Sequence, residues 1–275
     1  MTTAVATPHR TVDGRTNQAG LVTATTQVAK RVLIKFRRSP QLIIVGTLQG
    51  ALFLLIFRYV FGGAITTTGV DYVNFVVPGF ITTGALFNAM YAAVGAADDV
   101  HTGLISRLRS LPIPRSAVLL GRAVADTGIQ VWGLAVTIAI GFLVGFRLHN
   151  SWTAALAAFA LVVLFGFVFE WLFILVGMIA GTVEAAQGFS LFIFPLTFVS
   201  SAYVPVSTMP SWMQGFADNQ PTTVMVNAVR ALTEGSRAEA LLGHPAAYFV
   251  VRGVLWCVGL IAVFAPLAVA RYRRG

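Results

Sequence analysis

Residues 152–180 read WTAALAAFALVVLFGFVFEWLFILVGMIA, and this stretch decides the fold class. It holds a single charged residue, Glu170, and it exceeds the about 20 helical residues that cross a bilayer core of about 30 Å. Within lipid, a lone segment of this length satisfies its backbone hydrogen bonds only as a helix. The stretch therefore predicts a transmembrane helix.

The rest of the chain repeats this pattern. Hydrophobic residues make up 57% of the 275 positions and charged residues only 11%, which is far from the balance of a soluble domain. Further apolar stretches of spanning length are found at residues 41–61, 72–97, 117–146, 186–206 and 248–270. Pro195 and Pro205 interrupt the stretch at 186–206. We therefore predict an all-α polytopic membrane protein, with six transmembrane helices in a domain at residues 39–275.

The basic residues predict the orientation of these helices, because loops rich in Lys and Arg stay in the cytoplasm. With both termini cytoplasmic, fourteen of the nineteen basic residues lie on the inner side: Arg10, Arg15, Lys30, Arg31, Lys35, Arg37, Arg38, Arg107, Arg109, Arg115, Arg122, Arg271, Arg273 and Arg274. Topology and anionic lipid headgroups explain the net charge of +9, and no nucleic-acid recognition motif is present. We expect a multi-pass protein of the cytoplasmic membrane with no nucleic-acid partner.

The region before the first span divides into two parts. Residues 1–20 are polar and rich in Thr, which predicts a mobile cytoplasmic tail. Residues 21–38 form an amphipathic pattern, in which the apolar face carries Leu21, Val28, Val32, Leu33 and Phe36. Two interpretations of this pattern remain: a helix that lies in the cytoplasmic interface, or a basic flank that only sets topology.

The sequence shows no enzyme signature. Its two lysines, Lys30 and Lys35, do not follow a glycine, which excludes a Walker A phosphate loop. The four histidines are scattered without metal-ligand spacing, and the single cysteine, Cys257, lies inside the last span. We therefore expect no catalytic residues, metal site or bound cofactor in this chain.

The segment between the second and third spans predicts a short cytoplasmic helix. Its apolar stripe contains Leu104, Ile105, Leu108 and Leu111, with acidic residues at the start and basic residues near the end. Pro112 and Pro114 then end the helix. A short amphipathic helix of this kind is suited to docking into a groove on a partner protein.

Three motifs together resemble a known family. They are PGF at residues 78–80, TGLISRLRSLPIPRSAVLLGR at 102–122 and FPLTFVSSAYVPVSTMPSWMQGFADNQPTTVMVNAVRAL at 194–232. In this order within six spans, they resemble the type-two ABC exporter permeases, and among these the daunorubicin-resistance type. The resemblance covers the chain from about residue 21 onward.

This resemblance implies an export complex whose ATPase is a separate polypeptide. Two copies of that ATPase, binding ATP and Mg, would pair with this chain and a second permease chain, identical or homologous. Residues 98–115 would form the coupling helix, with coupling residues Thr102, Gly103, Leu104, Ile105, Leu108, Arg109, Leu111, Pro112, Pro114 and Arg115. The helix at residues 21–36 would brace the ATPase.

The resemblance also implies short helices after residue 206 that turn back into the outer leaflet and close the exit. Residues 209–216 and 222–232 suit this role because each is too short to span. They would equally suit an ordinary surface loop. The outer gate candidates are Pro205, Met209, Pro210, Asn219 and Pro221.

Glu170 is the acidic residue deep inside a span, where an unpaired charge is costly. It either lines the pathway or takes part in coupling, or it makes an interhelical hydrogen bond as a neutral carboxyl.

The sequence as a whole predicts the permease subunit of an ATP-driven exporter of a lipophilic or amphipathic drug, antibiotic or lipid. The alternative is a six-span secondary transporter or channel without an ATPase partner.

Overall fold

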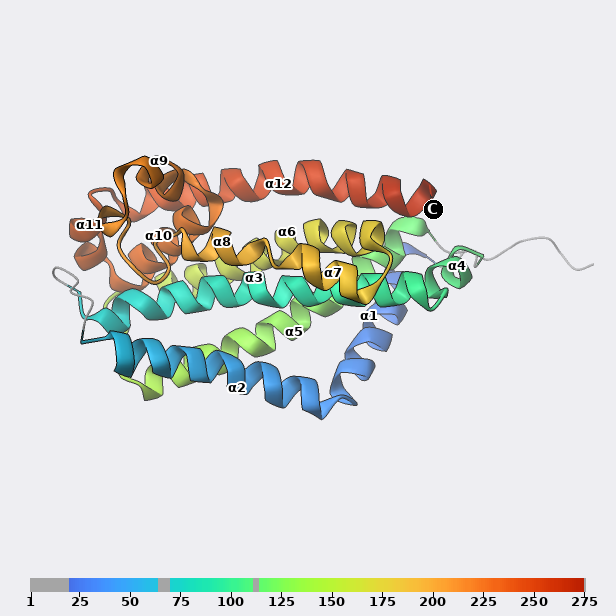
Figure 1. Cartoon of the computed structure of the whole chain (residues 1–275), viewed down its shortest axis with the longest axis horizontal. Helices are drawn as coiled ribbons and strands as arrows, with labels where there is room; N and C mark the ends of the chain where they lie inside the picture. The colour runs from blue at the N-terminus through green and yellow to red at the C-terminus, as the bar shows by residue number, and fades with distance from the viewer. Residues whose placement is uncertain (1–19, 64–69, 111–113, 275) are drawn as a thin grey trace, which may run out of the picture.

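The structure is a computed structural model that describes residues 20–63, 70–110 and 114–274. These residues form only helices and the turns between them. The helices α3 (Tyr72–His101), α5 (Arg115–Leu143), α6 (Trp152–Ala180) and α12 (Ala246–Arg274) form the body of an elongated bundle (Figure 1). All four are long and apolar enough to cross a membrane. The predicted all-α, polytopic membrane fold is therefore confirmed.

The first predicted span is helical throughout. Helix α2 (Pro40–Ile56) continues without a break into a π-helix (Phe57–Phe61), so its extent agrees with the predicted 41–61. Pro40 begins α2, where a proline lacks no required hydrogen bond. The residues described after the π-helix end at Gly63.

The fifth predicted span differs in form from the prediction. Residues 186–206 do not make one helix but α7 (Val183–Ser190), α8 (Ile193–Phe198) and an irregular segment that ends at a short 3-10 helix (Val206–Thr208). A proline inside a helix clashes with the carbonyl four residues earlier, and for Pro195 that carbonyl belongs to Leu191, where the helix breaks. Figure 1 shows α7 and α8 following α3 along the bundle, so a broken helix stands where one continuous span was predicted.

The two ends of the bundle carry different elements (Figure 1). At one end, called here the α4 end, lie α1 (Leu21–Arg37), α4 (Leu104–Arg109) and the end of α12. At the opposite end, the α10 end, lie α9 (Ser211–Asn219), α10 (Pro221–Glu234) and α11 (Ser236–Leu242). None of these shorter helices is long enough to span a bilayer.

The core is built around α3 and α6, which pack against each other along the bundle. Helix α3 presents small side chains to α6, and their exposed fractions are 3% or less: Ala89, Ala92, Ala93, Ala96 and Ala97. Small residues allow two helix backbones to approach closely in a membrane. Outward-facing Trp132, Leu143 and Leu255 on α5 and α12 are exposed, as expected of surfaces that meet lipid.

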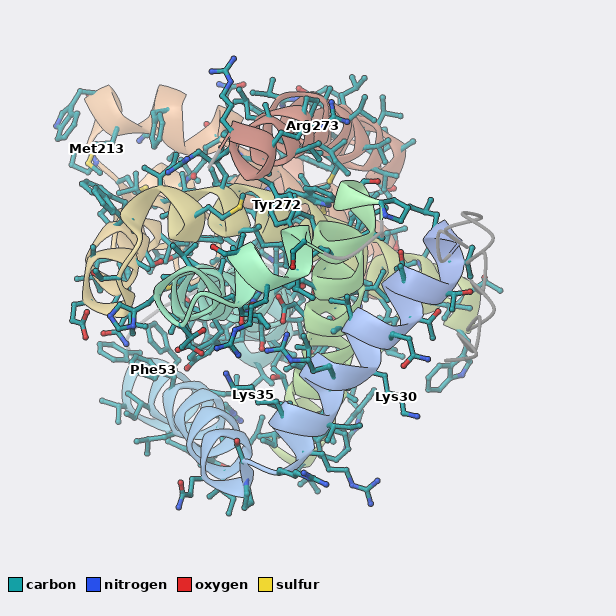
Figure 2. All side chains as sticks on the ribbon, turned by 90° about the vertical axis from the view of Figure 1, so that its right-hand side faces the viewer. Lys30, Lys35, Phe53, Met213, Tyr272 and Arg273 are labelled. Atoms are coloured by element: carbon teal, nitrogen blue, oxygen red, sulfur yellow. The ribbon has the colours of Figure 1, made fainter. Side chains whose placement is uncertain are left out.

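Helix α1 packs across α5 at the α4 end. Its buried face consists of Ala24 and Ala29, with Val28, Val32 and Phe36 half-buried beside them. Leu21 and Leu33, which belong to the predicted apolar face, are instead 46% and 41% exposed. Figure 2, which looks onto this end, shows Lys30 and Lys35 on opposite sides of α1.

Candidate functional site

The predicted coupling segment begins with a turn that requires glycine. Helix α3 ends at His101, and Gly103 follows in the left-handed conformation with φ of 68°. The Gly103 N–H donates to the Val100 carbonyl at 3.1 Å, and the Thr102 hydroxyl donates to the Asp98 carbonyl at 2.8 Å. These bonds end α3 and reverse the chain into α4.

The apolar stripe of α4 faces the protein. Ile105 is 9% exposed and packs in the core, while Leu108 is half-buried against it. Together with Val118 and Leu119 of α5, they line an internal gap of about 20 Å³. The six-residue helix α4 is thus held by contacts of Ile105 and Leu108 within this chain, and docking of its stripe into a partner's groove stays a prediction.

The outward face of α4 and of the turn before it is polar. The exposed residues there are His101, Thr102, Ser106, Arg107 and Ser110. Pro114 is the N-cap of α5. Two predicted coupling residues, Leu111 and Pro112, lie outside the described residues, and so do the side chains of Arg109 and Arg115.

Beneath α4, ion pairs connect three helices. We call them the Arg122 network, and their contacts are Lys35 Nζ to Asp98 Oδ2 at 2.9 Å, Arg31 to Asp99 at 3.8 Å, Arg122 to Asp99, and Arg122 Nε to Asp126 Oδ2 at 3.3 Å. Side-chain exposure falls from 68% at Lys35 to 12% at Arg122. The charges thus lead from the surface at α1, through the end of α3, into α5.

Glu170 lies beside the inner end of this network. It is 1% exposed on α6 and accepts a hydrogen bond from the Thr127 hydroxyl at 2.9 Å. Thr127 directly follows Asp126 of the network. The interhelical hydrogen bond considered for Glu170 is thus present, and the carboxyl faces α5 inside the bundle.

At the α10 end, side chains hold the irregular segment 199–205. Gln220 donates to the Val199 carbonyl, Thr223 accepts from the Ser201 N–H at 3.1 Å, and the Tyr72 hydroxyl donates to the Tyr203 carbonyl at 3.3 Å. A Cβ at Gly79 would overlap the Ala202 carbonyl oxygen, so the segment lies directly on the α3 backbone. Backbone groups that helix geometry leaves unpaired are satisfied here from neighbouring helices.

Arg230 is the central residue of this region, and sequence reasoning missed it. It is fully buried on α10 and donates to the carbonyls of Phe75 and Ser201 at 2.9 Å each, and to Asn227 Oδ1 at 2.8 Å. The sequence offers only a weak signal, an arginine within a stretch that carries no other charge at residues 221–232. Arg230 joins α10, the irregular segment and the start of α3.

The predicted outer gate residues all lie at helix boundaries of the α10 end. Pro205 precedes the 3-10 helix, Met209 and Pro210 connect that helix to α9, and Pro221 begins α10. Asn219 ends α9, and its side-chain oxygen accepts a hydrogen bond from Arg252 of α12 at 2.7 Å. The structure brings these residues to one end but does not join them in a single cluster.

A buried acid lies at the same end. Glu234 Oε2 is 2.9 Å from His149 Nδ1, and the Glu234 side chain is fully buried. Burial raises the pKa of the Glu234 carboxyl to about 7, although Arg237 and Arg230 act in the opposite direction. Thr233 accepts a further hydrogen bond from the His149 backbone at 3.0 Å. These contacts join the loop between α5 and α6 to α10.

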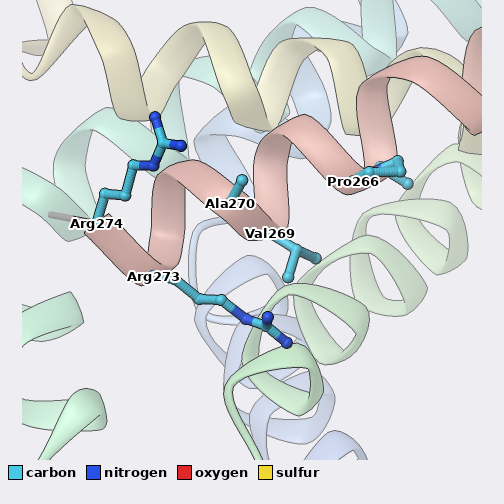
Figure 3. A pocket seen from close by; sticks show the side chains of 6 residues that line it. Pro266, Val269, Ala270, Arg273 and Arg274 are labelled. Atoms are coloured by element: carbon cyan, nitrogen blue, oxygen red, sulfur yellow. The ribbon is translucent and has the colours of Figure 1, made fainter.

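A separate hollow lies on the last turns of α12. Its volume is about 510 Å³, and its lining includes Pro266, Val269 and Ala270. Figure 3 shows Arg273 and Arg274 leaving α12 on opposite sides, so the two do not converge on one ligand. The hollow is open and mostly apolar, and Glu170 does not line it.

Comparison with known proteins identifies the family. Residues 23–233 match the ABC-2 type transporter family, and the chain belongs to it as a membrane-spanning permease. The chain is 34% identical to the daunorubicin resistance ABC transporter permease protein DrrB1 of Streptomyces coeruleorubidus, over 94% of this chain and 89% of the relative. It is 25% identical to the probable doxorubicin resistance ABC transporter permease protein DrrC of Mycobacterium tuberculosis, over 95% and 92%. The predicted family is confirmed.

Proposed function

We propose that this chain is the permease of an ATP-driven exporter, paired with a second permease chain and two copies of a separate ATPase that binds ATP and Mg. The observation that carries this proposal is the form of α4. It is a short helix at one end of the bundle, with a polar outward face and with Ile105 and Leu108 packed in the core. A rigidly held, polar protrusion is suited to receive force from a partner protein.

The charge distribution supports a cytoplasmic position for the α4 end. Among the described residues, this end carries most of the basic side chains, including those of α1 and the last turn of α12. Basic segments remain on the cytoplasmic side of a membrane. Both termini would then be cytoplasmic, and α9 to α11 would lie at the outer surface, with α10 dipping into the outer leaflet.

A continuous row of aromatic rings supports a lipophilic substrate. Ring centres are 4.9 Å apart for Phe57 and Tyr203, 5.2 Å for Tyr203 and Phe198, 6.4 Å for Phe198 and Phe194, and 5.2 Å for Phe194 and Phe87. Phe198 is 48% exposed. The row runs along α8 toward the middle of α3, and flat apolar compounds stack on such surfaces. The names of the two relatives refer to resistance to daunorubicin and doxorubicin.

Copurification tests the role of α4. The double substitution Ser106→Asp with Arg107→Asp changes only exposed residues of α4, so we expect normal membrane insertion and loss of the co-expressed ATPase. Arg237→Asp, at an exposed position of the α10 end, is the matched control and should retain the ATPase. If no ATPase copurifies with the unaltered chain, and daunorubicin efflux follows the proton gradient instead of ATP, the protein is a secondary transporter.

A further inference from the structure

The guanidinium of Arg122 fills the space beside Gly95 of α3, where a larger side chain would not fit. A Cβ at Gly95 would overlap a terminal nitrogen of Arg122, so the guanidinium lies directly on the α3 backbone. Asp99, one helical turn beyond Gly95, receives that guanidinium. Arg122 belongs to α5, and this contact is therefore a bridge from α5 to the last turns of α3, immediately before α4.

The charges around Arg122 have more than one partner each. Asp99 contacts both Arg31 and Arg122, and Arg122 contacts both Asp99 and Asp126. If the bridge between Arg122 and Asp99 opens, each group still faces an opposite charge. An ionic contact can therefore exchange partners without leaving a bare charge, whereas an apolar contact that separates leaves a gap.

Stability does not account for this network. Partly buried ion pairs contribute little more than apolar side chains of similar size, because removing the charges from water offsets their attraction. A set of charges with alternative partners instead supports two arrangements of similar energy, which is what a switching element requires.

We propose that Arg122 is a positioning residue for coupling, which passes movement of α4 through Asp99 to Asp126 and Glu170 in the spans. The path is continuous in the structure: Asp99 precedes α4, Arg122 bridges Asp99 to Asp126, and the adjacent Thr127 donates to Glu170. This inference rests on the proposed ATP-driven export and names a route within it.

The test compares transport with ATP hydrolysis in the assembled complex. Inside-out vesicles containing this chain and its ATPase would take up daunorubicin as the probe, and the ratio of uptake to ATP hydrolysed would be measured. We expect Arg122→Gln to lower this ratio at least about fivefold while the ATPase still copurifies. Asp99→Asn should have a similar effect, and the double variant should be no worse than either single variant.

A glycine pair provides the matched control. Gly95→Ala displaces Arg122 without removing any charge, so we expect it to lower the ratio of uptake to ATP hydrolysed. Arg122→Lys keeps the charge, so its ratio should lie between those of Arg122→Gln and the unaltered chain. Gly84→Ala lies on the same helix with nothing near its added Cβ, and it should leave the ratio unchanged.

The outcomes separate the two proposals. An unchanged ratio in Arg122→Gln, or effects of Arg122→Gln and Asp99→Asn that multiply in the double variant, would overturn the role of Arg122 while leaving ATP-driven export intact. Loss of the ATPase from the unaltered complex would instead count against the proposed function. If Arg122→Gln fails to fold and Gly95→Ala folds, the ratio of uptake to ATP hydrolysed in Gly95→Ala is the test. A lowered ratio supports the role of Arg122, and an unchanged ratio overturns it.

Discussion

The guanidinium carbon of Arg230 lies 3.7 Å from the centre of the Phe75 ring, and the same guanidinium donates two hydrogen bonds to the Phe75 carbonyl, at 2.9 and 3.2 Å. One residue of α10 thus holds both the side chain and the backbone of one residue of α3. A cation over an aromatic face is a strong contact at a buried site such as this one. Helix α10 is thereby fixed to the first turn of α3.

The first prediction concerns this contact. Arg230→Met keeps much of the side-chain length but leaves the carbonyls of Phe75 and Ser201 without their donor. Each unsatisfied buried acceptor costs about 1–3 kcal/mol, so we expect a loss of about 3 kcal/mol or more. Thermal unfolding of the purified protein in detergent measures it. Arg237→Met, at an exposed position, should change the midpoint little.

A second prediction concerns the close approach at Gly79. In Gly79→Ala the new methyl group meets the Ala202 carbonyl, and a backbone atom cannot rotate away, so we expect destabilisation of about 1–3 kcal/mol. Gly84→Ala, on the same helix and in open space, should be neutral or stabilising by up to about 1 kcal/mol. Equal midpoints of unfolding for the two variants would contradict the close contact.

The third prediction is a pH dependence at Glu234. Burial raises the folded-state pKa of Glu234 to about 7, so the protonated carboxyl favours the folded state. This contribution to the free energy of unfolding is lost as pH rises from the ordinary pKa of a glutamate through about 7. Glu234→Gln should therefore stabilise the protein at pH 8 and have little effect at pH 5. Unfolding midpoints at both values measure the difference, and a larger gain at pH 5 would reverse the sign and refute the argument.

A fourth prediction separates the two interpretations of Glu170. Glu170→Gln retains a hydrogen bond with Thr127 and removes only the ability to ionise. If Glu170 takes part in coupling, we expect normal assembly and altered daunorubicin-stimulated ATP hydrolysis. Transport that is unchanged over a range of pH in Glu170→Gln, with only lower stability in Glu170→Ala, would assign the residue a structural role.

The orientation of the bundle gives a fifth prediction. Single cysteines in a Cys257→Ala background report which end of the bundle lies outside the cell. A cysteine at Ser106 should be shielded from an impermeant thiol reagent in intact cells, whereas cysteines at Ser211, Asp218 and Ser236 should react. All four positions are exposed, so accessibility depends on sidedness alone. The opposite pattern would place α4 outside and leave it without access to an ATPase.

Continuous spans were predictable from local sequence. The stretch at residues 152–180 corresponds to α6 (Trp152–Ala180), because one apolar run sets both ends of the helix. The break near Pro195 was visible as an interruption, but its form depends on distant residues. Ser201 is held by Thr223 and Arg230, more than twenty positions away, and no periodicity reports such contacts.

Contacts between residues distant in sequence also explain what the sequence did not predict at the α4 end. The contact of Arg122 with Asp126 joins residues four apart on one helix, a spacing at which opposite charges commonly pair. The contact of Arg122 with Asp99 joins two helices and could not be read from spacing. The stripe of α4 was recognised, but the direction in which Ile105 points depends on where α5 lies.

The irregular segment 199–205 has a consequence for how this protein can evolve. Its backbone is held by side chains on other helices, chiefly Tyr72, Gln220, Thr223 and Arg230. Val204 of this segment is half-buried and its side chain supplies none of these bonds, whereas a change at any of the four supports removes a bond to the main chain. Homologous proteins should therefore tolerate substitutions more readily at Val204 than at Arg230, and the backbone conformation of the segment should be kept where Val204 differs.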